Sequence, residues 1–221
     1  MDWNEEGLEM PSVKDRLMWR YATKKYDPER KVPEDAIERI IEAMRLAPTS
    51  SGLQPFEVIL VRNADVRARI RKAAWDQAQI TEASHLMVLA AWDDITAERI
   101  HMMFDLTNDI RGFKNDGWEA YRQKLLGIVA EQGREADAQS AARQAYLGLG
   151  VGLMAAAFEG IDTTPMEGFE PAEVDRILGL EERGLRSVIV LPVGYRASEG
   201  DWLVDLKKVR RERAQFVTEV L

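Results

Sequence analysis

Apolar residues recur with a helical period in several segments of the chain. Residues 33–47 open with a proline and two acids, and Ile37, Ile40 and Met44 then follow at helical spacing. This pattern predicts an amphipathic helix with one buried face. The same spacing predicts shorter helices, which cover residues 12–20, 66–75 and 172–178. The first of these begins at Ser12, an N-cap residue followed three positions later by an acid.

Three segments have the length and composition of β-strands, namely residues 56–62, 86–92 and 187–195. We expect the first two strands to be buried. Pro192 lacks the amide hydrogen that a central strand needs, so it predicts that the third strand lies at a sheet edge or carries a bulge.

Residues 145–158 contain no charged side chain, and their apolar or small residues point in every direction around a helix. A helix of this kind is buried, and its fourteen residues fall short of the ~20 that a bilayer span needs. Gly148 and Gly152 lie one turn apart, where missing side chains allow another helix to approach closely. We expect Gly160 to end the helix. We also expect the two glycines to face outward and, with an extended apolar tail from Phe216, to be covered by a second subunit.

The segment from Thr96 to Gly133 has an amphipathic helical pattern that is interrupted at Gly112 and Gly117. It predicts one or two exposed helices, which carry Phe104, Phe113, Trp118 and Tyr121. Two aromatic residues three positions apart share a helical face, so Trp118 and Tyr121 either line a pocket or pack the helix onto the body.

Composition is that of a globular protein, with 46% hydrophobic and 31% charged residues among 221. We expect one domain over residues 1–221, with residues 1–11 as a frayed lead-in. A net charge of −8 argues against nucleic-acid and anionic-membrane partners, which favour a basic face. The chain has no cysteine, which excludes thiolate chemistry, and with no signal-peptide pattern it predicts a cytoplasmic location. Because the chain has no thiol, redox chemistry would require a cofactor.

The common catalytic motifs do not identify a function for this sequence. Gly150-x-Gly152-x-x-Ala155 matches the dinucleotide fingerprint in letters, but the residues before it form a helix where that fingerprint needs a strand. The sequence contains no Walker A, G-x-S-x-G or H-E-x-x-H motif, and its two histidines have no partner at metal-ligand spacing, so no metal site is expected. For His85, a hydrogen-bonded structural role is the better interpretation.

Positive charge gathers in two groups. The first is Arg20, Lys24 and Lys25, and the second is Lys207, Lys208, Arg210 and Arg211. Such groups are usually a solvated face, and phosphate binding is the alternative that their arginines also suit.

Four motifs in order resemble the FMN-dependent nitroreductase family, in particular its oxygen-insensitive NAD(P)H nitroreductase and dihydropteridine reductase branch. They lie at residues 20–27, 47–55, 165–169 and 208–210. The resemblance implies an α+β fold with a central, mostly antiparallel sheet flanked by helices. It also implies a homodimer that exchanges C-terminal extensions, with one FMN per subunit at the interface.

The resemblance also assigns roles to individual residues. The cofactor-binding residues it implies are Arg20, Tyr21, Ala22, Lys24, Pro48, Thr49, Ser50, Ser51, Asp76, Pro165, Glu167, Gly168, Lys208 and Arg210. Among these, Arg20, Lys208 and Arg210 would hold the phosphate, and Lys24 would face the pyrimidine edge of the flavin. Residues 49–51 would reach across from the partner subunit, and the amides of Glu167 and Gly168 would approach flavin N5.

Three positions depart from the family pattern. Ala22 stands where a serine is usual, Gly52 stands where an asparagine is frequent, and Asp76 stands where an asparagine commonly contacts the flavin. The resemblance places an aromatic residue, Trp118 or Tyr121, above the ring as a substrate contact.

The function we predict is an NAD(P)H oxidoreductase. It would transfer two electrons in ping-pong order from NADH or NADPH through FMN to a nitroaromatic, quinone or pterin-like acceptor, with no catalytic side chain. The alternatives are a specialised relative that reduces a flavin or an unsaturated carbonyl, and a non-catalytic flavin-binding protein.

Overall fold

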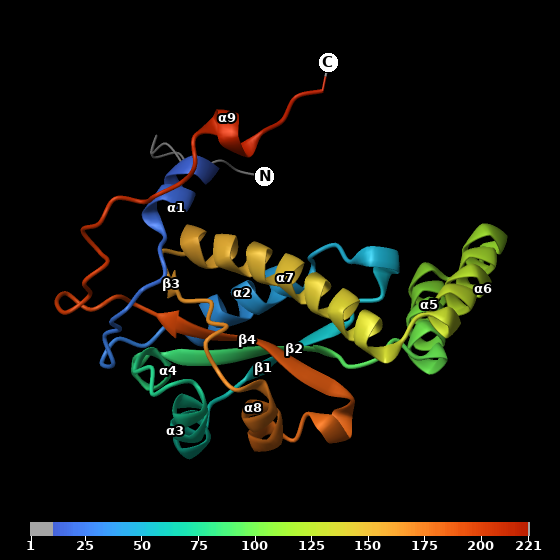
Figure 1. The fold of residues 1–221 in the computed structure, drawn as a ribbon, viewed down its shortest axis with the longest axis horizontal. Helices are drawn as coiled ribbons and strands as arrows, with labels where there is room; N and C mark the ends of the chain where they lie inside the picture. The colour runs from blue at the N-terminus through green and yellow to red at the C-terminus, as the bar shows by residue number, and fades with distance from the viewer. Residues whose placement is uncertain (1–10, 221) are drawn as a thin grey trace.

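The computed structural model describes residues 11–220 and has an α+β fold (Figure 1). Its strands are β1 (Phe56–Leu60), β2 (His85–Trp92), β3 (Asp162–Thr163) and β4 (Leu185–Gly194). Its helices are α1 (Val13–Trp19), α2 (Glu34–Arg45), α3 (Ala64–Ala73), α4 (Gln79–Glu82), α5 (Ala97–Arg111), α6 (Asp116–Glu131), α7 (Arg134–Phe158), α8 (Pro171–Leu178) and α9 (Arg213–Phe216). The strands form one sheet in the order β1-β2-β4-β3, and each neighbouring pair is antiparallel. The predicted fold class is confirmed.

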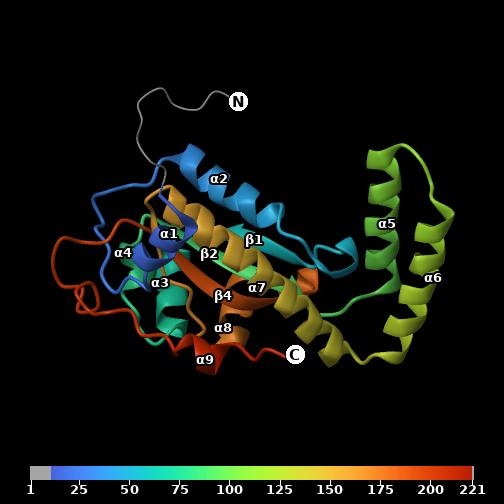
Figure 2. The ribbon, with the colours of Figure 1, turned by 90° about the horizontal axis from the view of Figure 1, so that it is seen from above.

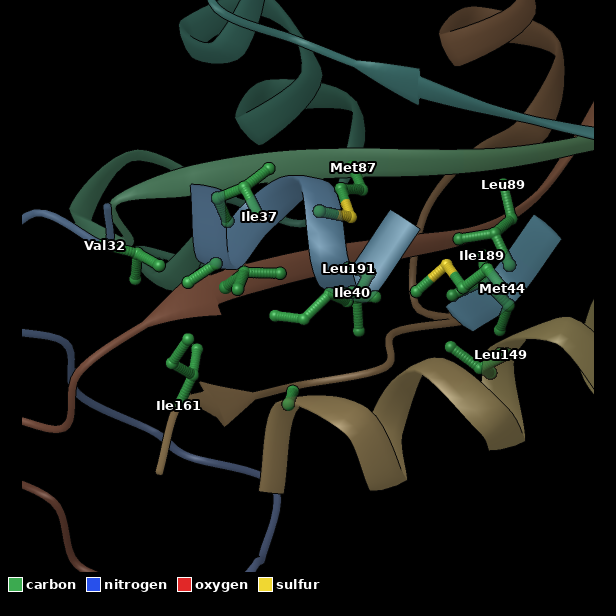
Figure 3. Close-up of a cluster of buried hydrophobic side chains, with 13 residues drawn as sticks. Val32, Ile37, Ile40, Met44, Met87, Leu89, Leu149, Ile161, Ile189 and Leu191 are labelled. Atoms are coloured by element: carbon green, nitrogen blue, oxygen red, sulfur yellow. The ribbon is translucent and has the colours of Figure 1, made fainter. Parts of the chain in front are cut away.

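Helices cover both faces of the sheet (Figure 1). Helices α2 and α7 lie on one face, and α3 and α8 lie on the other. Figure 3 shows Ile37, Ile40 and Met44 of α2 pointing toward β2 and β4, and all three are fully buried. Each fully buried side chain of this size contributes about 1.5–3 kcal/mol. The helical period read from the sequence therefore identifies the face of α2 that forms the core.

Helix α7 differs in part from the prediction. A Cβ atom at Gly148 would lie 2.4 Å from the Phe56 ring, and one at Gly152 would lie 2.2 Å from Met44. The close approach is confirmed, but the glycines face the protein's own core, so the expected outward orientation is wrong. The helix is not buried all round either, because an apolar stripe on its other face is exposed. That stripe is Leu147, Val151 and Phe158.

Two predictions about the strands are correct only in part. Strand β1 lies at the sheet edge and is only half-buried, with Glu57 exposed. Strand β4 is interior, so the edge alternative is wrong, but the strand does carry a bulge. Leu89 pairs with Ile189 and Ala90 pairs with Ser187, which leaves Val188 of β4 as the extra residue rather than the proline. Pro192 is tolerated because its carbonyl accepts a hydrogen bond from the Thr164 amide (3.1 Å), on the side where the two-residue β3 has just ended. An absent donor costs little at that point.

Helices α5 and α6 form a hairpin that projects from the body (Figure 2). Gly112 ends α5 in the left-handed conformation, as expected, whereas Gly117 lies inside α6 and interrupts nothing. Phe104 and Trp118 stack with their ring centroids 4.2 Å apart, and Phe104 is fully buried. The hairpin therefore has an aromatic core of its own.

Ser12 and Asp15 form the predicted capping box of α1. The predicted lead-in lies almost wholly outside the described residues. The segment expected to be extended from Phe216 begins with the last residue of α9, and residues 217–220 have no regular structure. No helix within residues 11–220 has the length and apolarity of a membrane span.

Candidate active site

A cavity of about 670 Å³ lies between two segments from opposite ends of the chain. Residues 18–22 form one wall, residues 203–210 form most of the other, and Pro165 and Arg196 complete the lining. This volume is in the range of sites that hold a small molecule or cofactor. The sequence-predicted binding residues that line it are Arg20, Tyr21, Ala22, Pro165, Lys208 and Arg210.

Positive charge is concentrated on both walls. Arg20, Lys208 and Arg210 form no ion pair with any carboxylate of residues 11–220. Burial and the neighbouring Arg210 lower the pKa of Arg20, and burial together with both arginines lowers the pKa of Lys208. Nε of Arg20 is buried without a hydrogen-bond partner in this part of the chain. A bound anion would relieve this repulsion and satisfy the unpaired donor.

The Lys208 side chain also holds the two walls together. Its ammonium group donates hydrogen bonds to the carbonyl oxygens of Leu17 and Arg20, at the end of α1. These carbonyls belong to the last turn of a short helix and its C-cap, where cations are favourable. The contact therefore brings Lys208 next to Arg20.

Arg196 anchors the first wall to the sheet. Its Nη2 lies 2.6 Å from Oδ1 of Asp162, which is only 3% exposed. The rings of Trp19 and Tyr21 each lie 4.6 Å from the Arg196 guanidinium carbon. The paired arginine thus fixes two neighbouring aromatic residues of the cavity.

Hydrogen bonds place Pro165 at the cavity. The Thr164 hydroxyl donates to the carbonyl of Thr23 (2.7 Å) and lies 2.9 Å from the hydroxyl of the fully buried Tyr26. Ala22 forms an isolated bridge with Thr163. The cavity therefore meets a methyl group at Ala22, at the position where the family pattern has a hydroxyl.

Glu167 and Gly168 follow Pro165 but do not line the cavity. Glu167 is exposed and accepts a hydrogen bond from the hydroxyl of Tyr146, whose pKa rises to about 12 through burial and this carboxylate. A Cβ atom at Gly168 would lie 2.9 Å from the ring of Trp75, so the residue must be small as long as that ring stays in place. This loop is therefore closely packed although it is near the surface.

Asp76 does not point its carboxylate at a ligand. The residue has a positive φ of 55°, and its Oδ1 accepts a hydrogen bond from Nε of Arg71 at 2.8 Å. Lys24 is half-buried, and its amide donates to Asp201 at 2.8 Å, but it does not line the cavity.

Pro48, Thr49, Ser50 and Ser51 also lie outside this cavity. The Ser50 amide donates to Oε1 of Gln144 (2.8 Å), and the hydroxyls of Ser51 and Tyr121 lie 2.7 Å apart. These bonds hold Ser51 in the left-handed conformation, with φ 55°. The structure thus joins the loop of residues 48–51 to the α5–α6 hairpin within one chain.

Trp118 and Tyr121 pack inside the hairpin. Trp118 stacks on Phe104, and Tyr121 lies 5.7 Å from Trp118 between ring centroids. Within one chain this favours the packing interpretation of both rings.

His85 has the predicted structural role. Its Nδ1 lies 3.0 Å from Oγ of Ser84, and its Nε2 lies 3.1 Å from Oε1 of Glu34.

Sequence reasoning missed several residues of the site, among them Trp19, Arg196 and Asp201. Arg196 and Asp201 act through partners that lie far away in sequence, and no local spacing signals such pairs. Only the two basic groups, around Arg20 and around Lys208, gave a sequence signal.

Comparison with known proteins agrees with this architecture. Residues 17–195 match the Nitroreductase family. The chain is 31% identical over 212 residues to the oxygen-insensitive NAD(P)H nitroreductase of Salmonella typhimurium, covering 91% of this chain and 96% of that protein. It is 30% identical to the enzyme of the same name from Enterobacter cloacae, over 90% of this chain and 95% of the relative.

A solved structure shares the fold. It comes from Exiguobacterium sibiricum, is assigned to the nitroreductases and is in complex with FMN. It superposes with a TM-score of 0.80 at 18% identity, over 95% of this chain and 98% of the other. The fold, together with the family match and the named relatives, defines an α+β oxidoreductase. The chain belongs to the Nitroreductase family, as its motifs predicted.

Proposed function

We propose that this protein is an FMN-dependent NAD(P)H oxidoreductase, carried by one domain, that passes two electrons in ping-pong order to a nitroaromatic, quinone or pterin-like acceptor. The observation that supports it most is the group of three cations without a carboxylate partner in residues 11–220, which lines a cavity of about 670 Å³. A phosphate monoester carries close to two negative charges at neutral pH and suits such a group. The relatives' names agree, since they are NAD(P)H nitroreductases.

FMN fits the residues that are present. Arg20, Lys208 and Arg210 would hold the phosphate, and the apolar side chains of Leu203 and Leu206 offer surface to the rest of the molecule. The amide of Gly168 lies on the loop that follows Pro165, and we propose that it approaches the ring of the bound flavin. When bound, FMN supplies the redox chemistry, accepting a hydride from the nicotinamide and passing two electrons to the acceptor.

The remaining predicted residues act around that group. Lys24 would add positive charge near the ring edge and stabilise its reduced form. Asp76 stays a proposed neighbour through its backbone, because its carboxylate is held by Arg71. Pro48, Thr49, Ser50, Ser51, Trp118 and Tyr121 would reach the flavin of a partner subunit.

A homodimer accounts for the exposed apolar surface. The stripe of Leu147, Val151 and Phe158 on α7 is contiguous along one helix face, and Phe216 on the C-terminal segment is 73% exposed. Apolar residues aligned in this way are expected at an interface between subunits. A second copy would cover the stripe, and the C-terminal segments would be exchanged.

The test is to purify the protein, denature it and identify any released flavin. FMN at close to one per chain is expected, and FAD or no flavin would overturn the proposal. The holoprotein is then assayed with NADH and NADPH against nitroaromatic, quinone, pterin, flavin and enone acceptors. Turnover of only a flavin or an enone would favour the specialised relative, and turnover of none of them would favour a flavin-binding protein. Fractionation of cells tests the cytoplasmic location.

A further inference from the structure

Asp201 connects the two walls of the cavity. It is 7% exposed and follows β4 by seven residues. Its Oδ2 accepts hydrogen bonds from the Tyr21 hydroxyl and from the Lys24 amide, both at 2.8 Å. Its Oδ1 accepts from the Leu203 amide at 2.9 Å. One oxygen therefore binds the first wall, and the other binds the second.

All three donors are uncharged, so the carboxylate is stabilised by hydrogen bonds and not by an ion pair. Burial acts to raise the pKa of Asp201, but the Lys24 and Leu203 amides and the Tyr21 hydroxyl outweigh it, and the pKa lies below its ordinary value. Asp201 is thus ionised at neutral pH, with acceptor capacity on both oxygens.

The geometry requires a carboxylate. An asparagine has almost the same shape, but one of its two terminal atoms is an NH2 group that only donates. The amide of Lys24, two residues beyond the first wall, and the amide of Leu203 in the second wall both donate to Asp201, so an amide side chain must place its NH2 group against one of these donors. It can satisfy the Lys24 side or the Leu203 side, but not both.

We propose that Asp201 is a positioning residue for the phosphate site. Through its two oxygens it fixes residues 21–24 against the segment that begins at Leu203, and so sets the separation between Arg20 on the first wall and Lys208 with Arg210 on the second. Asp201 does not line the cavity and acts through the wall residues that it binds. This inference rests on the proposed function, because it concerns how that cofactor's phosphate is held.

A change in the spacing of the three cations should affect only the binding of ligands that carry a phosphate group. Riboflavin has the same ring and side chain as FMN but no phosphate, so its affinity does not depend on the spacing of the three cations. A loss of cation spacing weakens FMN and leaves riboflavin nearly unchanged, whereas general damage to the fold weakens both ligands.

The experiment measures dissociation constants of FMN and riboflavin for flavin-free full-length protein, by quenching of flavin fluorescence. For Asp201→Asn we expect the preference for FMN over riboflavin to fall by about three- to tenfold, the effect of one hydrogen bond lost between the walls. Tyr21→Phe removes one bond and leaves both amides satisfied, so we expect a smaller fall in the same preference.

Asp175→Asn is the matched control. Asp175 is also 7% exposed and also accepts a main-chain hydrogen bond, from Ser187 at 2.7 Å, but it does not border this cavity. Its substitution should leave the preference for FMN unchanged even if it lowers the melting temperature.

The outcomes separate the two proposals. If the unmodified protein binds neither flavin, the proposed function fails. If it binds FMN tightly and Asp201→Asn keeps the preference, or loses both ligands equally, the role of Asp201 is wrong and the proposed function stands. Should Asp201→Asn not fold, the Tyr21→Phe result decides, because an unchanged preference there overturns the inference.

Discussion

Two regions of the molecule differ in whether their charged side chains have partners of opposite charge. At Asp93, which is 8% exposed, one carboxylate meets two arginines, with Arg99 at 3.4 Å and Arg134 on the other oxygen. At the cavity, Arg20, Lys208 and Arg210 have no carboxylate partner in residues 11–220. The first group is balanced within the chain and stabilises the fold. The second has no such partner among these residues, which is typical of a site that binds an anion.

The pKa shifts express the same difference. Burial acts to raise the pKa of Asp93, but Arg134 and Arg99 outweigh it and hold the pKa below its ordinary value. The pKa values of Arg20 and Lys208 are also lowered, which for a base means that the charged form is disfavoured. Asp93 is therefore stabilised as an ion by its surroundings, and the cavity cations are not.

The largest effect on stability is expected at the balanced group. Asp93→Asn leaves Arg99 half-satisfied beside the Gly184 carbonyl (2.9 Å) and should lower the free energy of unfolding by about 2–3 kcal/mol at neutral pH. Because the folded pKa of Asp93 is depressed, its stabilisation is present above the ordinary value near 3.8 and is lost as pH falls through the folded pKa. Urea unfolding at pH 7 and pH 3 measures this. The exposed Asp109→Asn is the control, and an equal loss at both pH values would contradict the assignment.

A smaller effect, on binding and not on folding, is expected at the cavity. Arg210→Ala should weaken FMN binding by about 1.5–3 kcal/mol, the value of a charged hydrogen bond. The melting temperature of the flavin-free protein should stay the same or rise, because a repelling charge is removed. Arg211→Ala, the next arginine but outside the cavity, should leave FMN affinity nearly unchanged. Unchanged affinity in Arg210→Ala would clear that residue of the role, and a lower melting temperature would place it with the balanced group.

The smallest effect on stability is expected at a buried carboxylate, Asp137. Asp137 is 1% exposed, its Oδ1 has no hydrogen-bond partner among residues 11–220, and burial together with Asp94 raises its pKa. A raised folded pKa means that stability is present below the ordinary value near 3.8 and is lost as pH rises through the folded pKa. Asp137→Asn should therefore stabilise the protein at pH 7 by less than Asp93→Asn destabilises it. Thermal unfolding across pH 4–7 would show the gain growing with pH, and a gain that is constant or absent would rule this out.

Local pattern predicted the elements better than it predicted their surroundings. The face of α2 and the ends of α5 and α7 follow from residue spacing and from Gly112 and Gly160, because those signals act within a few residues. The orientation of Gly148 does not follow from residue spacing. A glycine indicates only that another group packs closely against the helix, and not whether that group belongs to the same chain. Pro192 was misleading about the sheet edge because it lies beside the point where β3 ends, and β3 is about thirty residues away in the sequence.

The same limit applies to the site. Arg20 and Lys208 could be found because the resemblance names them and their charge is visible in the sequence. Asp201 and Arg196 could not, because each is defined by a partner across the fold, with Tyr21 and Asp201 separated by 180 positions. Residues 48–51 lie in a loop that leads into a short 3-10 helix at Ser50–Gly52, and their contact with a flavin stays a prediction.

The bond from Lys208 to the Leu17 carbonyl spans 191 positions, which has a consequence for synthesis. A ribosome that builds the chain from its N-terminus completes α1 and α7 long before residues 203–210 exist, whereas the interior strand β4 ends only nine positions before residue 203. The first wall of the cavity must then wait, with its aromatic residues and Arg20 open to water, until the second wall is translated and docks. We therefore expect the cavity to be complete only after the second wall has docked, so a chain released after β4 should not retain the flavin.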